Sequence, residues 1–308
     1  MCIIVNKKEA VMGVLYLIGA KIGAIGKMIA MKKCGNAAKG AKNSLKINLI
    51  RSLGCVFISL IICVFIGFQD VSDKAVLYSV SSGIANALLL FAWVLCAERC
   101  ALCTVEIFCM IGGVVLPMIL APLMFSGESV SIYQWIGALM LIPAAYCFFP
   151  KNKGNASFSL SAIPLLLLSG LSNAGCVISQ KLFTAYGEGT VADFNLITFV
   201  VCTLTLAILF VIIKIFKKEL PPAHESKSNS LMYLSVYIFV AIVMLYASQF
   251  LNTLASGKLS PAIFYPLSYA ISMPMTLLTD IVIFKEKIRT PYFIGISLVI
   301  GAIILINL

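Results

Sequence analysis

The sequence predicts an all-α integral membrane protein with ten transmembrane helices, arranged as two inverted five-helix repeats. Three observations predict this fold class. First, 61% of the 308 residues are hydrophobic and only 11% are charged, whereas about 25% of the residues in a soluble domain are charged. Second, the chain divides into ten apolar runs, each close to the ~20 residues that a helix needs to cross a bilayer. Third, the two halves of the chain repeat one another.

The connections between the ten runs are too short to hold a folded soluble domain. The runs are continuously apolar and lack the alternation of a transmembrane β-strand, so we predict helices. The first run continues past Lys21 without a small-residue cleavage site, which favours a span over a signal peptide. The predicted spans are residues 10–31, 45–67, 75–96, 101–125, 130–149, 158–181, 190–213, 231–254, 260–284 and 290–307.

Basic residues fall mainly on alternate connections, and this bias predicts an orientation. The connections after the odd-numbered spans hold fifteen of them and the opposite side holds five, so the positive-inside rule places both termini outside. We interpret these charges as topology signals and lipid contacts, and we predict no nucleic-acid partner. The larger group is Lys32, Lys33, Lys39, Lys42, Lys46, Arg99, Lys151, Lys153, Lys214, Lys217, Lys218, Lys227, Lys285, Lys287 and Arg289, and the smaller is Lys7, Lys8, Lys74, Lys181 and Lys258.

A repeat with a period of 158 residues divides the chain into residues 1–150 and 151–308. In the first copy AERC leads through a span to Glu128 and then to QWIG, and in the second ASGK leads through a span to Glu286 and then to YFIG. Each half holds five spans, an odd number, so the second half must enter the membrane from the opposite side. Inverted repeats of this kind are the structural basis of alternating access, in which two half-bundles rock around a central site.

These features resemble the drug/metabolite transporter superfamily, and specifically its EamA-like members. The residues that carry the resemblance are Arg51 early in the second span and the glutamates Glu128 and Glu286 that end the fourth and ninth spans, each followed by a glycine-bearing span. The resemblance covers nearly the whole chain. It implies a basket-like bundle, a central cavity and a small-molecule substrate such as an amino acid, a sugar or another metabolite. It also implies cytoplasmic termini, opposite to the charge count, so the orientation stays open.

Polar residues inside the spans are candidates for the substrate site, because lipid disfavours them and they should face a wet interior. Spacings of three or four residues place several of them on one helix face, most clearly Tyr265, Tyr269, Ser272 and Thr276 in span nine. Packing between helices is the alternative, and for Ser and Thr it is the favoured one. The predicted substrate-binding residues are Tyr16, Lys21, Asn86, Trp93, Asn173, Tyr246, Gln249, Tyr265 and Tyr269.

Charged residues inside the spans predict an electropositive cavity. Lys21 falls near the centre of span one, where a charge costs about 2.5 to 3.5 kcal/mol. Together with Lys27 and Arg51 it is expected to favour a substrate that carries a carboxylate or a phosphate. Snorkelling, or pairing with Glu106, is the alternative. We assign Lys27, Arg51 and Glu106 to the cavity rim or to charge sensing.

Glycines and prolines predict packing and bending. Gly19, Gly23 and Gly26 are spaced for close approach of span one to a neighbouring helix. Prolines inside the spans free carbonyls and let a helix bend, although tolerated prolines are also common in membrane helices. The predicted hinge residues are Pro117, Pro266 and Pro274.

We therefore predict a secondary active transporter of the plasma membrane for a small polar metabolite such as an amino acid or organic anion, with export as the expected direction. The alternatives are a lipid-carrier flippase of the same superfamily and a non-transporting assembly partner. An enzyme is disfavoured, because the single histidine, His224, lies in a connection and no catalytic motif occurs. No ATP-binding motif or metal set is present, so we expect no cofactor and a proton, ion or substrate gradient as the energy source. The protein is expected to be a monomer or a homodimer.

Overall fold

The computed structural model describes residues 7–37, 41–97, 102–124, 131–147, 162–215, 231–285 and 290–306. Within these ranges the chain forms ten α-helices and no strand, which confirms the all-α prediction, and each helix overlaps one predicted span. Glu128, Glu286 and His224 lie outside the described residues. The helices are α1 (Lys7–Ala37), α2 (Ala41–Ile66), α3 (Asp73–Ala97), α4 (Leu102–Met124), α5 (Ile132–Cys147), α6 (Ala162–Tyr186), α7 (Val191–Ile215), α8 (Leu231–Lys258), α9 (Pro261–Val282) and α10 (Thr290–Ile306).

Seven of the described helices, α1 to α4 and α6 to α8, are long and apolar enough to cross a membrane. Helices can cross the hydrocarbon core of a bilayer because their backbone N–H and C=O groups form hydrogen bonds within the helix. The apolar stretches of α5 and α10 are shorter, Ile132–Ala144 and Phe293–Ala302. The chain is therefore a multi-pass membrane protein. Helix length and composition support seven membrane spans in the described residues, and the arrangement of ten spans stays a prediction.

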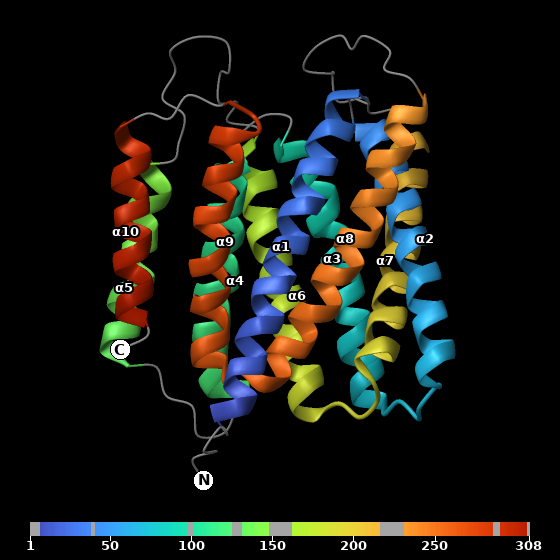
Figure 1. The fold of residues 1–308 in the computed structure, drawn as a ribbon, viewed down its shortest axis with the longest axis horizontal. Coiled ribbons are helices and arrows are strands. Elements are labelled where there is room, and N and C mark those ends of the chain that lie inside the picture. Colours follow the sequence, from blue (N-terminus) through green and yellow to red (C-terminus); the bar gives the residue numbers. More distant parts are fainter. Residues whose placement is uncertain are drawn as a thin grey trace.

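The helices stand side by side with roughly aligned axes (Figure 1). The most extensive pairings are α1 with α8, α3 with α6, α2 with α7 and α5 with α10, and α4 packs against both α6 and α9. The α5–α10 pair lies at one edge of the bundle, and the α2–α7 pair lies at the opposite edge. The helices between these edges, together with α2, surround the interior where the polar residues gather.

Glycines permit the close contact between α1 and α8. A Cβ atom added at Gly23 would lie 3.1 Å from the Met244 carbonyl oxygen and 3.2 Å from the Ser248 nitrogen. At Gly19 it would lie 3.0 Å from the Leu251 side chain. The predicted close approach of this span to a neighbour is therefore confirmed, and α8 is that neighbour.

Ion pairs fasten the two ends of α1 to other helices. Near its start, Glu9 Oε1 lies 3.8 Å from Lys258 Nζ of α8. Near its other end, Lys32 Nζ lies 3.9 Å from Asp280 Oδ1 of α9 and 3.9 Å from the centre of the Phe284 ring. The middle of α1, between these ends, carries the lysines that face the interior.

Lys181 is not a residue of a connection, as the charge count assumed. It lies inside α6, its side chain is buried with 8% of the residue exposed, and Nζ donates hydrogen bonds to the carbonyl oxygens of Ser256 at 2.6 Å and Leu259 at 2.8 Å. These carbonyls belong to the C-terminal end of α8, where helix geometry leaves acceptors without intrahelical donors. The lysine therefore caps α8 and does not act as a topology signal.

The predicted hinge prolines lie within uninterrupted helices. Pro117 is buried in α4, Pro274 is exposed in α9, and Pro266 also lies within α9. Pro261 occupies the start of α9, where its missing N–H costs nothing. Bending at the three hinge positions stays a prediction.

Candidate functional site

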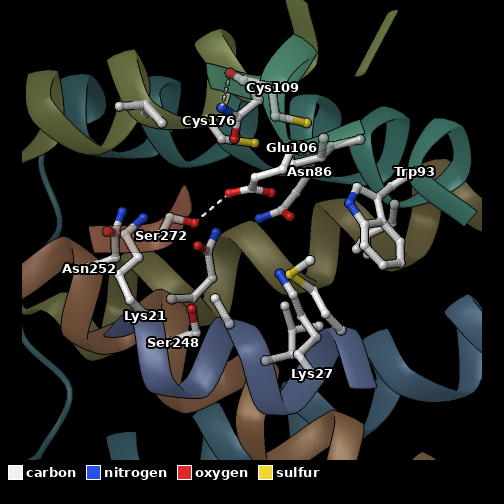
Figure 2. Close-up of a pocket in the computed structure, with 18 of the residues that line it drawn as sticks. Lys21, Lys27, Asn86, Trp93, Glu106, Cys109, Cys176, Ser248, Asn252 and Ser272 are labelled. Atoms are coloured by element: carbon white, nitrogen blue, oxygen red, sulfur yellow. Dashed lines mark hydrogen bonds between the residues drawn. The ribbon is translucent and has the colours of Figure 1, made fainter. Parts of the chain in front are cut away.

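A cavity lies inside the bundle, and α1, α2, α3, α4, α6, α8 and α9 contribute its wall (Figure 2). It measures about 120 Å³, less than the roughly 300 to 1,000 Å³ of pockets that hold drug-sized ligands. A small molecule therefore fits, whereas a larger one requires the helices to move apart.

Three basic side chains face this cavity. Lys21 and Lys27 come from one broad face of α1, about 9 Å apart along the helix axis, and Lys27 points from α1 into the cavity in Figure 2. Arg51 comes from α2, is only 2% exposed, and its Nε has no hydrogen-bond partner among the described residues. In the described part of the chain, no carboxylate lies within ion-pair distance of any of the three. Among the described residues, this positive charge therefore has no direct counter-charge.

Glu106 of α4 brings a carboxylate into the same cavity. Its Oε1 accepts a hydrogen bond of 2.5 Å from the Ser272 hydroxyl of α9, and both side chains point toward each other in Figure 2. The sequence placed Glu106 near the membrane surface, about a turn and a half into its span. In the structure the cavity extends to this level, so Glu106 shares its wall with Lys21.

Asn173 of α6 joins three helices at the cavity wall. Its Nδ2 donates to the carbonyl oxygen of Cys109 in α4 at 2.8 Å and also contacts the hydroxyl of Tyr269 in α9. Gly113 of α4 makes room for this arrangement, because a Cβ there would collide with the Tyr269 hydroxyl. Asn173 and Tyr269 thus hold each other in place at the cavity wall.

A second set of amides links α6 to α8. Gln180 Nε2 donates to Gln249 Oε1 at 3.2 Å, and Asn252 Nδ2 donates to Gln180 Oε1 at 2.7 Å. Two amide atoms of the cavity wall are buried without a hydrogen-bond partner among the described residues, Asn86 Nδ2 and Asn252 Oδ1. Buried polar atoms in folded proteins are nearly always paired. These two are therefore available to a ligand or to water.

Aromatic rings complete the wall. Trp93 of α3 lines the cavity beside Asn86, because the two residues lie on the same face of the helix about two turns apart. Lys21 Nζ lies 5.5 Å from the centre of the Tyr269 ring, within the range of a cation–π contact. Such a contact stabilises the lysine charge only in part, by about 0.5 to 2 kcal/mol, so the ring does not replace a counter-ion.

Most of the predicted site residues meet at this cavity. Those that line it are Lys21, Asn86, Trp93, Asn173, Gln249 and Tyr269, together with Lys27, Arg51 and Glu106. The structure adds lining residues that the prediction did not select, chiefly Gln180, Ser248, Asn252, Ser268 and Ser272. Helical spacing could have identified two of them, since Gln180 lies seven residues after Asn173 and Asn252 lies three residues after Gln249, on the same helix faces.

Three predicted tyrosines lie away from the cavity. Tyr246 is buried against Phe199 and Phe250, with ring centres 6.0 and 5.9 Å apart. Tyr265 is buried with its ring 5.5 Å from that of Phe264, and Tyr16 packs against the same apolar cluster. The helical stripe of span nine therefore divides: Tyr269 and Ser272 reach the cavity, whereas Tyr265, a turn earlier, packs in the core.

Metal binding finds no support in the described ranges. No group of three or more His, Cys, Asp or Glu side chains lies close enough there to hold a metal ion. The thiols of Cys109 and Cys176 line the cavity as separate side chains from α4 and α6.

Comparison with known proteins gives a likeness of fold. No family model and no curated protein matches the sequence. Chains of solved structures do match, 28 of them. One is a crystal structure that aligns over 97% of this chain and 96% of its own length, with a TM-score of 0.61 and 12% sequence identity. The arrangement of helices therefore recurs in a solved protein over nearly the full length, while the identity is too low to carry function.

Proposed function

We propose that this chain is a secondary transporter that carries small anions across a membrane by alternating access. The observation that carries the proposal is the set of Lys21, Lys27 and Arg51, which face one cavity without a carboxylate in ion-pair reach among the described residues. Charge inside a membrane protein is expensive to hold without a partner and commonly marks a substrate pathway. A bound carboxylate or phosphate supplies the missing counter-charge.

Helix packing supports two halves of five helices, residues 1–150 and 151–308. Each helix of the first half is compared with the helix five places later. The contact of α1 with α8 then corresponds to that of α6 with α3, α1 with α9 to α6 with α4, and α2 with α8 to α7 with α3. The pairs α2–α7, α4–α9 and α5–α10 correspond to themselves. A pseudo-two-fold axis between the halves produces this pattern.

The connections support an inverted relation between these halves. Residues 67–72 follow α2 and residues 187–190 follow α6. The Ser72 N–H donates to the Glu188 carbonyl oxygen at 3.3 Å, and the Glu188 N–H donates to Ser72 Oγ at 3.1 Å. The end of the second helix of one half thus lies beside the end of the first helix of the other. Halves of the same orientation would place these ends on opposite sides of the bundle.

The resemblance to the drug/metabolite transporter superfamily and its EamA-like members belongs to this proposal. It rests on the five-plus-five spans, on Arg51 and on the repeated glutamates, and a cavity between the halves is consistent with it. A site near the middle of a bundle, at the interface of two repeats, is where transporters of this architecture bind their substrates.

Flux through reconstituted protein tests the proposal. Succinate and inorganic phosphate serve as carboxylate and phosphate probes, and choline serves as a cation. We expect saturable counterflow of at least one of the anions and none of choline. Arg51→Gln should lower that flux at least tenfold, because it removes the least exposed of the cavity charges. Lys46→Gln is the matched control, since Lys46 lies on the same helix and is exposed.

Two results would contradict the proposal. Anion flux that persists unchanged when both Lys21 and Arg51 are neutralised would mean that the cavity charges do not bind the substrate. Flux confined to a labelled phospholipid would favour the flippase instead.

A further inference from the structure

Glu106 is the one carboxylate among the described residues that line the cavity. The Ser272 hydroxyl donates to it, yet no lysine or arginine of the described residues lies within ion-pair distance. A carboxylate in a membrane protein that faces a polar cavity is a candidate for proton transfer. The proposed function leaves this residue without a role, since a negative charge in the cavity opposes the binding of an anion.

Charged and titratable groups around Glu106 come from five of the helices that line the cavity, while α8 presents the neutral Ser248, Gln249 and Asn252. From α1 and α2 these are the cations Lys21, Lys27 and Arg51. From α4 itself, α6 and α9 they are Cys109, Cys176 and Tyr269, while α3 presents only the neutral Asn86 and Trp93. Free thiols and phenols ordinarily lose their protons only above neutral pH. Glu106 is therefore the one carboxylic acid of this set.

We propose that Glu106 is the binding site of a coupling proton, and that the proton and an anionic substrate occupy the cavity together. This inference rests on the proposed transport function. A bound anion and the Glu106 carboxylate repel each other, and protonation of Glu106 removes the repulsion. By linkage, the proton then strengthens anion binding by the same factor by which the anion strengthens proton binding. Transport is therefore a symport of anion and proton.

Ser272 suits both states of Glu106. A hydroxyl both donates and accepts, so Ser272 donates to the carboxylate and can accept from the protonated carboxyl group. The contact between α4 and α9 is thus kept throughout the cycle. The proton enters from water on one side, travels on Glu106 Oε1 or Oε2, and leaves to water on the other side with the anion. A monovalent anion then crosses without net charge, and a dianion such as sulfate crosses with one net negative charge.

Co-transport sets a direction that differs from the expected export. A symporter moves its substrate the way the proton runs, and across a plasma membrane with an inward proton gradient this is uptake. Export would instead require the proton and substrate to compete for one site. In this cavity the substrate charge is expected at Lys21, Lys27 and Arg51, so the two ligands occupy different groups.

Binding measurements on the purified protein test the coupling. Sulfate stays fully ionised throughout the range in which carboxylic acids titrate, so it is the probe for the pH series, and succinate is the carboxylate probe at neutral pH. In the wild type, affinity should fall by up to about tenfold per pH unit as pH rises, the limit for one linked proton. Glu106→Gln mimics the protonated state and should bind the probe at all pH values with little change. Glu9→Gln, in the exposed pair with Lys258, is the matched control and should keep the pH dependence.

Flux measurements complete the test. An inward proton gradient should drive accumulation of the bound probe in wild-type proteoliposomes. Glu106→Gln should lose this accumulation and keep anion-for-anion counterflow, while Glu106→Asp should restore part of the coupling. Wild-type accumulation that is indifferent to the proton gradient would overturn the proton site and leave the transporter standing. Equal pH dependence in wild type and Glu106→Gln would also overturn it. Absence of binding and flux for sulfate, succinate and inorganic phosphate alike would overturn the proposed function, and this inference with it.

Discussion

Two regions of the molecule bury lysines in opposite ways. At the end of α6, Lys181 donates two hydrogen bonds, to the carbonyl oxygens of Ser256 and Leu259. In the middle of α1, Lys21 and Lys27 face a cavity, and neither nitrogen has a hydrogen bond or ion pair with the described residues. A charge whose donors are satisfied stabilises the fold, whereas a charge left open in a cavity costs stability and is accessible to a ligand. Hydrogen bonding therefore separates structural lysines from candidate functional ones.

The strongest test of this comparison is Lys181→Met, which keeps a long unbranched side chain and removes the ammonium group that donates the hydrogen bonds. The carbonyl ends of α8 would lose two charge-assisted hydrogen bonds, so we expect about 3 kcal/mol of lost folding stability. Unfolding of the purified protein in detergent measures the loss, and anion binding by the protein that stays folded should match the wild type. A wild-type unfolding midpoint would show that water or other donors replace Lys181.

The opposite result is expected for Lys27→Met. This change removes a charge without a direct partner and keeps the apolar stem, so the unfolding free energy should stay constant or rise by about 1 kcal/mol. Binding of sulfate or succinate should fall at least tenfold in the same protein. Lost stability together with retained binding would reverse the roles assigned to the two lysines.

The sequence predicted the elements well because apolar runs are a local signal. All ten described helices overlap predicted spans, and six of the nine predicted substrate-binding residues line the cavity. Of the 23 basic residues, the topology count left out only Lys21, Lys27 and Arg51, and these three meet at the cavity. Charges that do not belong to a connection therefore pointed to the site.

The errors arose where long-range packing decides the outcome. Helical spacing placed Tyr265 on the stripe of Tyr269, but spacing does not say where along a helix the cavity ends. Lys181 looked like a connection residue because it lies near the end of a span, and the α8 carbonyls that bury it are 75 and 78 residues away in sequence. Glu106 was assigned to the cavity rim or to charge sensing, and it lines the cavity. Its depth in the cavity depends on the packing of seven helices, which spacing along one helix does not give.

The smallest expected effect on folding free energy is that of removing Lys258, a partly exposed lysine near the same end of α8. Lys258 and Glu9 form a pair of 3.8 Å, with side chains that are 35% and 59% exposed. Solvent screens such a pair, and ordering two long side chains offsets its attraction, so Lys258→Met should change the folding free energy by no more than about 0.5 kcal/mol. The same unfolding assay measures it beside Lys181→Met. If the two changes cost the same, removal of a lysine anywhere near the end of α8 destabilises the bundle, and the hydrogen bonds of Lys181 would not be the reason for its effect. A clear difference between them ties the stabilisation to the two carbonyl acceptors, to which the Lys258 side chain donates no hydrogen bond in the described structure.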